Sequence, residues 1–193
     1  MYIFFHNIRV KFMKLFITII FFIIGVKINA MNLLDYKVDE KKITLEDWKF
    51  FSDQVMGGVS EGKTSLKKDQ NKLFLRLEGS VSTKNNGGFI QVRKEYQIKD
   101  NNYKGIRLKA RGIESEYYIH IRTKKLFLPW QYYAGKFFVS KEWTNLEIRF
   151  DDFVKSNFYQ PQKFTPSEIK SIAFVAFGKD FNAQLDIIEA ELF

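Results

Sequence analysis

The chain has no cysteine, and only three prolines and two histidines occur among its 193 residues. The absence of cysteine excludes disulfide bonds, cysteine-ligated zinc, thiol catalysis and a lipoprotein anchor. His6 lies in the N-terminal segment, so His120 is the single histidine of the remaining chain. One histidine cannot build a histidine-rich zinc or iron site, and no glycine-rich phosphate loop opens a helix. We therefore expect no cofactor.

Charge of one sign is only in mild excess. The net charge is +9, but the first thirty residues carry four basic groups and no acid, which leaves 27 basic against 22 acidic residues, or +5. Nucleic-acid binding needs a clustered basic stripe, so we expect no nucleic-acid partner. A hydrophobic share of 46% and a charged share of 27% are typical of one folded domain at this length. The 21 Phe residues favour strands over helices.

The N-terminal segment has the layout of a secretory signal peptide. About a dozen apolar residues, Leu15–Val26, follow three basic residues and precede Ala30, a small residue suited to cleavage. This run is short for a transmembrane anchor, which needs roughly 20 residues. We predict that residues 1–30 are a signal peptide, whether translation starts at the first methionine or at Met13. Residues 31–193 then form one domain in the periplasm or outside the cell. A retained segment would anchor the domain to the inner membrane, the one case in which we expect membrane contact.

The remaining chain reads as short strands separated by turns. Four segments alternate strictly between apolar and polar residues: 72–78, 105–112, 117–123 and 144–150. This period of two is typical of antiparallel strands with one buried face. Two segments that are apolar on both faces suit central strands: 172–177 and 185–188. Further strands are expected at 43–51, 64–68, 88–96 and 132–139, and one helical turn at Pro166. The pattern predicts an all-β fold, a two-sheet antiparallel sandwich.

One motif is similar to that of a serine hydrolase. Gly58–Gly62 matches Gly-x-Ser-x-Gly, which requires Ser60 on a strand-to-helix turn and a histidine within hydrogen-bond reach. The residues after it show no helical period, and His120 falls in mid-strand, so a glycine-rich turn is the better interpretation. Calcium bound by carboxylates and a two-carboxylate glycosidase stay open as alternatives, although no pair of acids stands out. We predict that the protein is not an enzyme.

Three segments together resemble one family. They are WKFFSDQVMGGVSEG at 48–62, NNGGFIQVR at 85–93 and WTNLEIRFDDF at 143–153. In this order they look like the complex I intermediate-associated protein 30 family, in a short bacterial form. The resemblance implies a jelly-roll sandwich of the galactose-binding type without catalytic activity, and eukaryotic members assist the assembly of respiratory complex I. The export signal would place this domain across the membrane from the peripheral arm of that complex.

The family motifs also have a physical interpretation. Gly57–Gly58 and Gly87–Gly88 allow backbone angles that side chains forbid, so they shape two loops. Asp53 and Asn86 can hydrogen-bond nearby backbone and lock those loops, or take part in binding. Three apolar motif residues are expected in the core: Trp48, Met56 and Phe89.

A polar ligand would find its best site on an outward row of the predicted sheets. We predict that this row contains Arg93, Arg111, His120 and Arg122, with Trp130 and Tyr132 just beyond it. Arginine forks and aromatic faces suit sugars, anionic glycans or a protein loop, unless these residues only form an exposed sheet face.

Two functions follow from these residues. The first is a protein-interaction or assembly factor outside the cytoplasm, whose partner could be a membrane complex; an exposed apolar patch would favour it. The alternative is a periplasmic carbohydrate-binding module, which a concave groove lined by Trp130, Tyr132 and Arg122 would favour.

Overall fold

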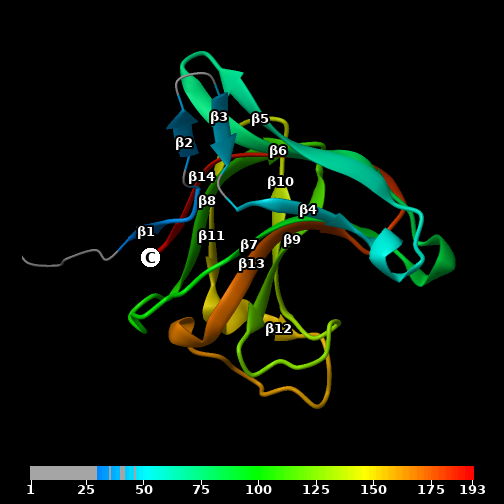
Figure 1. The fold of residues 1–193 in the computed structure, drawn as a ribbon, viewed down its shortest axis with the longest axis vertical. Coiled ribbons are helices and arrows are strands. Elements are labelled where there is room, and N and C mark those ends of the chain that lie inside the picture. Colours follow the sequence, from blue (N-terminus) through cyan, green and yellow to red (C-terminus); the bar gives the residue numbers. More distant parts are fainter. Residues whose placement is uncertain (1–29, 35, 40–41, 46) are drawn as a thin grey trace, which may run out of the picture.

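Two antiparallel sheets form the body of the protein (Figure 1). The computed structural model describes residues 30–34, 36–39, 42–45 and 47–193, so nearly all of the predicted signal peptide lies outside the described residues. Within these ranges no helix has the length and apolar character needed to cross a membrane. The predicted two-sheet sandwich is confirmed.

The first sheet is named the β14 sheet after its central strand. Its strand order is β11-β8-β14-β6-β5, with the short β1 also paired to β14, and every pairing is antiparallel. The strands are β1 (Met31–Asn32), β5 (Glu61–Asp69), β6 (Lys72–Val81), β8 (Gly105–Gly112), β11 (Thr144–Arg149) and β14 (Phe181–Leu192).

The second sheet is named the β13 sheet. Its order is β12-β10-β9-β13-β7-β4, again antiparallel throughout. The strands are β4 (Lys49–Ser52), β7 (Phe89–Glu95), β9 (Ser115–Thr123), β10 (Tyr133–Val139), β12 (Val154–Lys155) and β13 (Ile169–Phe177). A separate hairpin pairs β2 (Tyr36–Asp39) with β3 (Lys42–Leu45).

In the part of the chain that the structure describes, the strands are connected by four short 3₁₀ helices: η1 (Asp53–Met56), η2 (Lys84–Asn86), η3 (Phe150–Asp152) and η4 (Pro166–Glu168). The predicted helical turn at Pro166 is confirmed as η4. A capping box closes its N-terminus, because the Thr165 N–H donates to Glu168 Oε2 at 3.2 Å and the Thr165 side chain accepts the Glu168 N–H.

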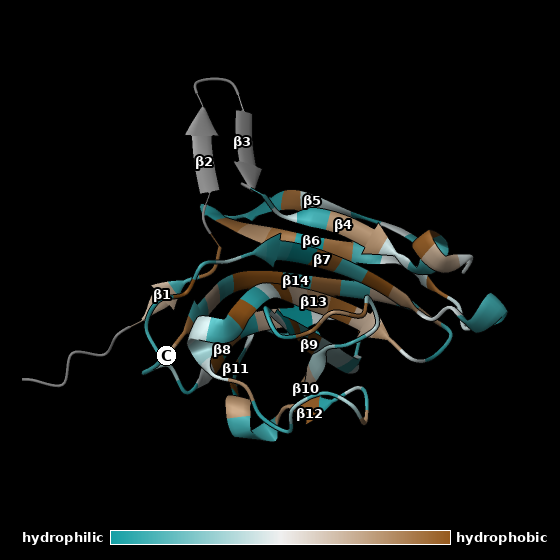
Figure 2. Cartoon of the chain, turned by 60° about the horizontal axis from the view of Figure 1, so that its bottom comes forward, coloured by the Kyte–Doolittle hydropathy of each residue, from teal (hydrophilic) through white to brown (hydrophobic). Residues whose placement is uncertain are grey.

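The core lies between the inward faces of the two sheets. Leu75, Leu77 and Ile187 from the β14 sheet face Ile119 and Phe174 from the β13 sheet, and all are at most 1% exposed. The central strands β13 and β14 are mainly brown in Figure 2, whereas the loops are largely teal. The two segments predicted as central strands, 172–177 and 185–188, are thereby confirmed in that role.

Some sequence predictions need correction. The segment 43–51, expected as one strand, is divided between β3 and β4. The two-residue strands β1 and β12 were missed because so short a strand carries no periodic signal. Trp48 does belong to the core and stacks on Phe174 at 5.2 Å. Met56 does not: it lies in η1 with 60% of its surface exposed.

Candidate binding face and aromatic end

The outward face of the β13 sheet carries a cluster of four rings, contributed by Tyr118, His120, Tyr132 and Phe177. The His120 and Tyr132 rings stack with centroids 3.9 Å apart and planes 16° apart. Phe177 meets His120 edge-on at 5.5 Å and Tyr118 at 5.8 Å. Register places Val175 opposite Tyr118, on the outward face of the sheet. Val175 is nevertheless fully buried, because the four rings cover it. The rings therefore form a packed platform rather than separate mobile side chains.

His120 is the buried member of this platform. It is 9% exposed, and its Nε2 has no hydrogen-bond partner. Burial lowers the pKa of His120 to about 3, because the charged imidazolium would lose its hydration. The ring is therefore neutral at physiological pH, and so weak a base is poorly suited to accept a proton from a serine hydroxyl.

Two arginines flank the platform. Register places Arg93 and His120 on either side of Ala173, and the Arg93 guanidinium lies 4.2 Å from the centre of the Phe51 ring. Burial lowers the pKa of Arg93 and the nearby Arg122 adds to this, while Glu95 opposes it. Arg122 donates through Nη2 to the Leu128 carbonyl at 3.1 Å, but its Nε is buried without a partner.

Arg111 lies elsewhere, which corrects the predicted row. It belongs to β8, in the other sheet, where Nε contacts Asp186 at 3.3 Å and Nη1 contacts Asp69 at 3.1 Å. Arg76 makes two short bonds to the same fully buried Asp186, at 2.6 and 2.7 Å. Arg111 also lies 4.4 Å from the Trp143 ring. It stabilises the outer surface of the β14 sheet and does not share a face with Arg93, His120 and Arg122.

Beyond the platform, two loops form one end of the molecule, which we call the aromatic end (Figure 1). Loop 124–132 joins β9 to β10, and loop 156–165 follows β12. Ser156 Oγ donates to Trp130 O at 3.0 Å and accepts the Tyr132 N–H at 3.0 Å, which ties the loops together. Five apolar side chains of the aromatic end are exposed: Phe127 (88%), Leu128 (40%), Trp130 (56%), Phe158 (83%) and Tyr159 (87%).

Two buried glutamines hold these loops in shape. Gln131 Oε1 accepts the backbone N–H groups of Phe127 at 3.2 Å and Leu128 at 3.1 Å. Gln160 donates from Nε2 to Tyr132 O at 2.9 Å. The glutamines are 6% and 4% exposed. The aromatic end is therefore preorganised, and Tyr132, whose backbone belongs to it, continues it into the ring platform.

Asp53 forms a third constellation, which links η1 to two other segments. Its side chain is fully buried and accepts the Ser60 hydroxyl at 2.5 Å, and the N–H groups of Ser60 at 2.8 Å, Gly88 at 2.5 Å and Phe89 at 3.3 Å. Burial alone would raise the pKa of Asp53, but these hydrogen bonds outweigh burial and lower the pKa. The expected loop-locking role of Asp53 is confirmed.

The glycines of the family motifs make room for this carboxylate. A Cβ at Gly58 or at Gly87 would overlap the Asp53 side chain. Across the loops it is the Asn85 amide that donates, to Gly57 O at 3.3 Å, whereas the neighbouring Asn86 is exposed with a φ of 58°. The two motifs are thus two halves of one buried polar site.

The hydrolase alternative loses its nucleophile in this arrangement. Ser60 is fully buried, donates to Asp53 and accepts the Ser82 N–H at 2.9 Å. Of the acids near strand ends that calcium would require, Asp151, Asp152 and Asp180, two have protein partners: Asp151 contacts Lys163 at 2.9 Å, and Asp180 accepts from Thr83 at 2.6 and 2.7 Å. Over the described ranges, no three His, Asp or Glu side chains gather in a way that could hold a metal ion.

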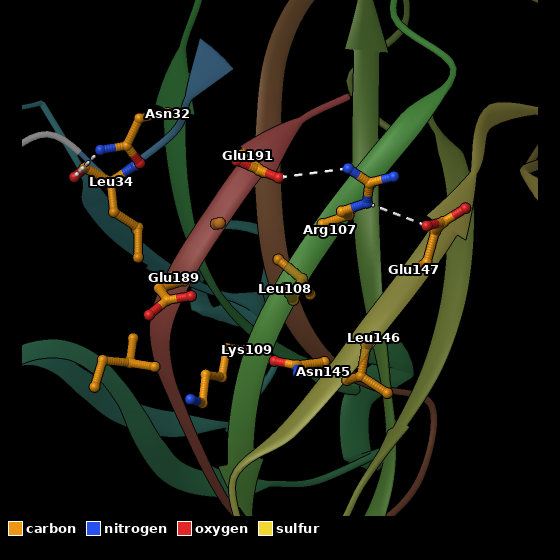
Figure 3. A pocket seen from close by; sticks show the side chains of 12 residues that line it. Asn32, Leu34, Arg107, Leu108, Lys109, Asn145, Leu146, Glu147, Glu189 and Glu191 are labelled. Carbon is orange, nitrogen blue, oxygen red and sulfur yellow. Dashed lines mark hydrogen bonds and ion pairs between the residues drawn. The ribbon is translucent and has the colours of Figure 1, made fainter. Parts of the chain in front are cut away.

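A hollow of about 520 Å³ lies on the outward side of the β14 sheet (Figure 3). Its charged groups are largely matched in pairs, since Arg107 contacts Glu147 at 3.1 Å and Glu191 at 3.7 Å. Asn32 and Leu34 close one side of it. Because Arg107 already has two acidic partners within the chain, it offers a ligand less than Arg93 and Arg122 of the β13 sheet do.

Comparison with known proteins agrees with this architecture. Residues 35–187 match the sequence model of the family described as complex I intermediate-associated protein 30. No curated protein sequence matches the chain.

Several solved structures share the fold. A family 11 carbohydrate-binding module from a cellulosomal cellulase of Clostridium thermocellum superposes with a TM-score of 0.66 at 14% identity, covering 86% of this chain and 94% of that one. A family 11 module from the same organism, in complex with a β-1,3-1,4-mixed-linked tetrasaccharide, gives 0.63 at 14% identity, covering 85% and 95%. An exo-β-agarase gives 0.53 at 5% identity, covering 83% of this chain and 25% of the enzyme. The shared feature is the jelly-roll sandwich.

Proposed function

The chain belongs to the complex I intermediate-associated protein 30 family, and we propose that it is a non-catalytic domain that acts outside the cytoplasm and binds a protein partner through its aromatic end. Family membership supports a protein partner, and the apolar run at residues 15–26 supports export. An exported member would serve a partner on the outer side of the inner membrane, such as the exposed part of a membrane complex.

The observation that carries this proposal is the exposure of the aromatic end. Phe127, Phe158 and Tyr159 each leave more than four fifths of their surface in water. Burying a large apolar side chain in an interface contributes about 1.5–3 kcal/mol before the costs of association. Because Gln131 and Gln160 already hold the loops, little further ordering is needed on binding. Trp and Tyr are also the residue types that most often dominate interface energies.

The test is capture from isolated membranes with the full chain as bait. We expect one defined protein to be recovered by the unaltered chain and lost with Phe127→Ser combined with Phe158→Ser. Val55→Ser with Met56→Ser is the matched control, since these side chains are 73% and 60% exposed in η1. If the same protein is recovered equally by all three chains, the aromatic end is not the binding surface.

A second candidate function is carbohydrate binding on the outward face of the β13 sheet. The ring platform of Tyr118, His120, Tyr132 and Phe177 favours it, because aromatic faces stack on sugar rings. The likeness in fold to carbohydrate-binding modules is consistent with it. A glycan array separates the two candidates. If no sugar on the array binds, the result contradicts carbohydrate binding but does not contradict protein binding.

A further inference from the structure

We infer that the outward face of the β13 sheet binds an acidic saccharide, a sugar chain bearing carboxylates, which Arg93 and Arg122 hold while Tyr132 and Trp130 stack on the sugar rings. This inference rests on the second candidate function, carbohydrate binding, and names the class of sugar.

The first support is the distribution of ion pairs. Among the arginines of the described ranges, four contact a carboxylate: Arg76, Arg107, Arg111 and Arg149. Arg93 and Arg122 have no ion pair, and both lie on this face. Their mutual proximity disfavours charge, as the pKa of Arg93, lowered by burial and then by Arg122, indicates. Two neighbouring cations without a counterion are a receptor for an anion.

The acids near this face do not neutralise it. Glu116 is engaged by Lys136 at 2.9 Å. Glu95 lies on the same face at the end of β7, two residues from Arg93 and across Ser171 from Arg122, and it acts on Arg93 only through space, without an ion pair among the described residues. On the opposite side Lys49 of β4 pairs in register with Arg93 and adds a further positive charge. The face therefore keeps a positive character in its centre.

The second support is a pair of unsatisfied polar atoms. Arg122 Nε and His120 Nε2 are both buried without a hydrogen-bond partner, and they come from alternate residues of β9, on the same side of the sheet. Buried polar atoms are normally hydrogen-bonded, so an unpartnered pair at one place points to an absent ligand group. A guanidinium offers two parallel N–H donors, which match the two oxygens of a carboxylate.

The third support distinguishes a sugar from a bare anion. Arg93 of β7 pairs with Ala173 of β13 and Arg122 of β9 pairs with Ser171, so two strand spacings and two residues along the strands put their backbones roughly 12 Å apart. A ligand that contacts both must be extended. On the far side of β9 from Arg93 lies the half-buried Tyr132, which directly precedes β10 and stacks on His120 at 3.9 Å, and the 56% exposed Trp130 stands two residues before it. Both rings can meet the apolar side of a sugar. An acidic peptide would use the charges but has no need of this platform.

The experiment measures binding of the full chain to four probes by calorimetry: oligogalacturonate, its methyl ester, a mixed-linkage β-glucan oligosaccharide and poly-glutamate. We expect oligogalacturonate to bind and its uncharged methyl ester to bind at least tenfold more weakly. Arg93→Gln and Arg122→Gln should each weaken binding of oligogalacturonate at least tenfold. Tyr132→Ala should weaken binding of both saccharide forms.

Arg107→Gln is the matched control, because Arg107 also lies over a phenylalanine, with its guanidinium 4.0 Å from the Phe193 ring, but on the other sheet. It should change affinity less than twofold. Equal binding of the β-glucan and oligogalacturonate would keep the carbohydrate function and overturn this inference. Equal binding of poly-glutamate would overturn it in favour of an acidic peptide. Silence with every probe would refute both the inference and the carbohydrate function. A thermal melt of each variant confirms that it is folded.

Discussion

Replacing Asp53 by asparagine should destabilise the domain severely, although the change is nearly isosteric. The carboxylate accepts four hydrogen bonds in a fully buried place, two of them at 2.5 Å. An asparagine has one acceptor oxygen, and its NH₂ group would point at N–H donors of Ser60 or Gly88. Some of those donors would then be buried without an acceptor.

The size of the effect follows from the hydrogen bonds lost. A hydrogen bond to a charged group contributes about 1.5–3 kcal/mol, and bonds sharing one carboxylate are not additive. Oδ1 accepts only the Ser60 N–H and Oδ2 accepts the other three bonds, so an asparagine loses at least the Ser60 N–H bond. It also sets an NH₂ group against that donor and weakens the other three bonds by removing the charge, which together should cost about 4 kcal/mol. For a domain of this size, each kcal/mol lowers the melting temperature by roughly 2–4 °C, so we expect a fall of about 8–16 °C.

Urea unfolding of the full chain measures this loss directly. Asp151→Asn is the control, because Asp151 is exposed and pairs only with the exposed Lys163, and it should leave the midpoint unchanged. The pH dependence gives a second signature. Since the pKa of Asp53 is lowered in the fold, its stabilisation is present above the ordinary value of 3.8 and is lost as pH falls through the folded value. A free energy of unfolding for Asp53→Asn within about 1 kcal/mol of that of the unaltered chain would refute this account.

Gly58 offers a sharper form of the same test. Gly58→Ala places a methyl group against the Asp53 carboxylate and should be strongly destabilising. In an Asp53→Gly background all three side-chain atoms that this methyl group would overlap are gone, so the same substitution should cost much less. Additive losses in the double variant would mean that the two residues do not act as one site.

Three further predictions concern other parts of the chain. The pKa of His120 is lowered to about 3 in the fold, whereas its unfolded value is 6.5. The stability that the neutral ring provides is therefore fully present above pH 6.5, and the free energy of unfolding falls by up to about 1.4 kcal/mol per pH unit as pH drops from 6.5 toward 3. His120→Phe should flatten this slope between pH 6.5 and 4.5 in urea titrations, and an unchanged slope would assign it to other groups. Asp186→Ala leaves Arg76 and Arg111 without their shared carboxylate and should lower the free energy of unfolding by about 3–5 kcal/mol in the same assay. A loss below about 1 kcal/mol would contradict the burial argument. Cell fractionation with mass spectrometry should find the chain outside the cytoplasm with its N-terminus at Met31, and an intact chain in the cytoplasm would disprove export.

The sequence alone could predict most strands but not the sheet to which each belongs. Alternation shows that Arg111 and Arg122 point away from a core, and both lie on outward faces of their strands. Alternation does not indicate which strands pair, because pairing depends on contacts between residues that are far apart in the sequence. For this reason Arg111 was placed with Arg93, although β8 and β7 lie in opposite layers.

The candidate site was predictable in part for similar reasons. Mixed aromatic and cationic residues near 118–132 were a usable signal for the ring platform. Phe158 and Tyr159 were not predicted, because apolar residues in a long loop have no period that distinguishes an exposed position from a buried one. Met56 was expected in the core because it is hydrophobic. In η1, however, the buried residue is Asp53, whose carboxylate has hydrogen-bond partners there.

The position of Asp53 between the sheets has a mechanical consequence. Ser60 leads into β5 of one layer, whereas Gly88 and Phe89 lead into β7 of the other, so a single carboxylate fastens the two layers at this corner. Phe51 precedes it by two residues on the edge strand β4 and supports the Arg93 guanidinium from below. Loss of the Asp53 hydrogen bonds should therefore allow β4 to move and should lower the affinity of Arg93 for a ligand. Asp53 would thus influence recognition although no ligand contacts it.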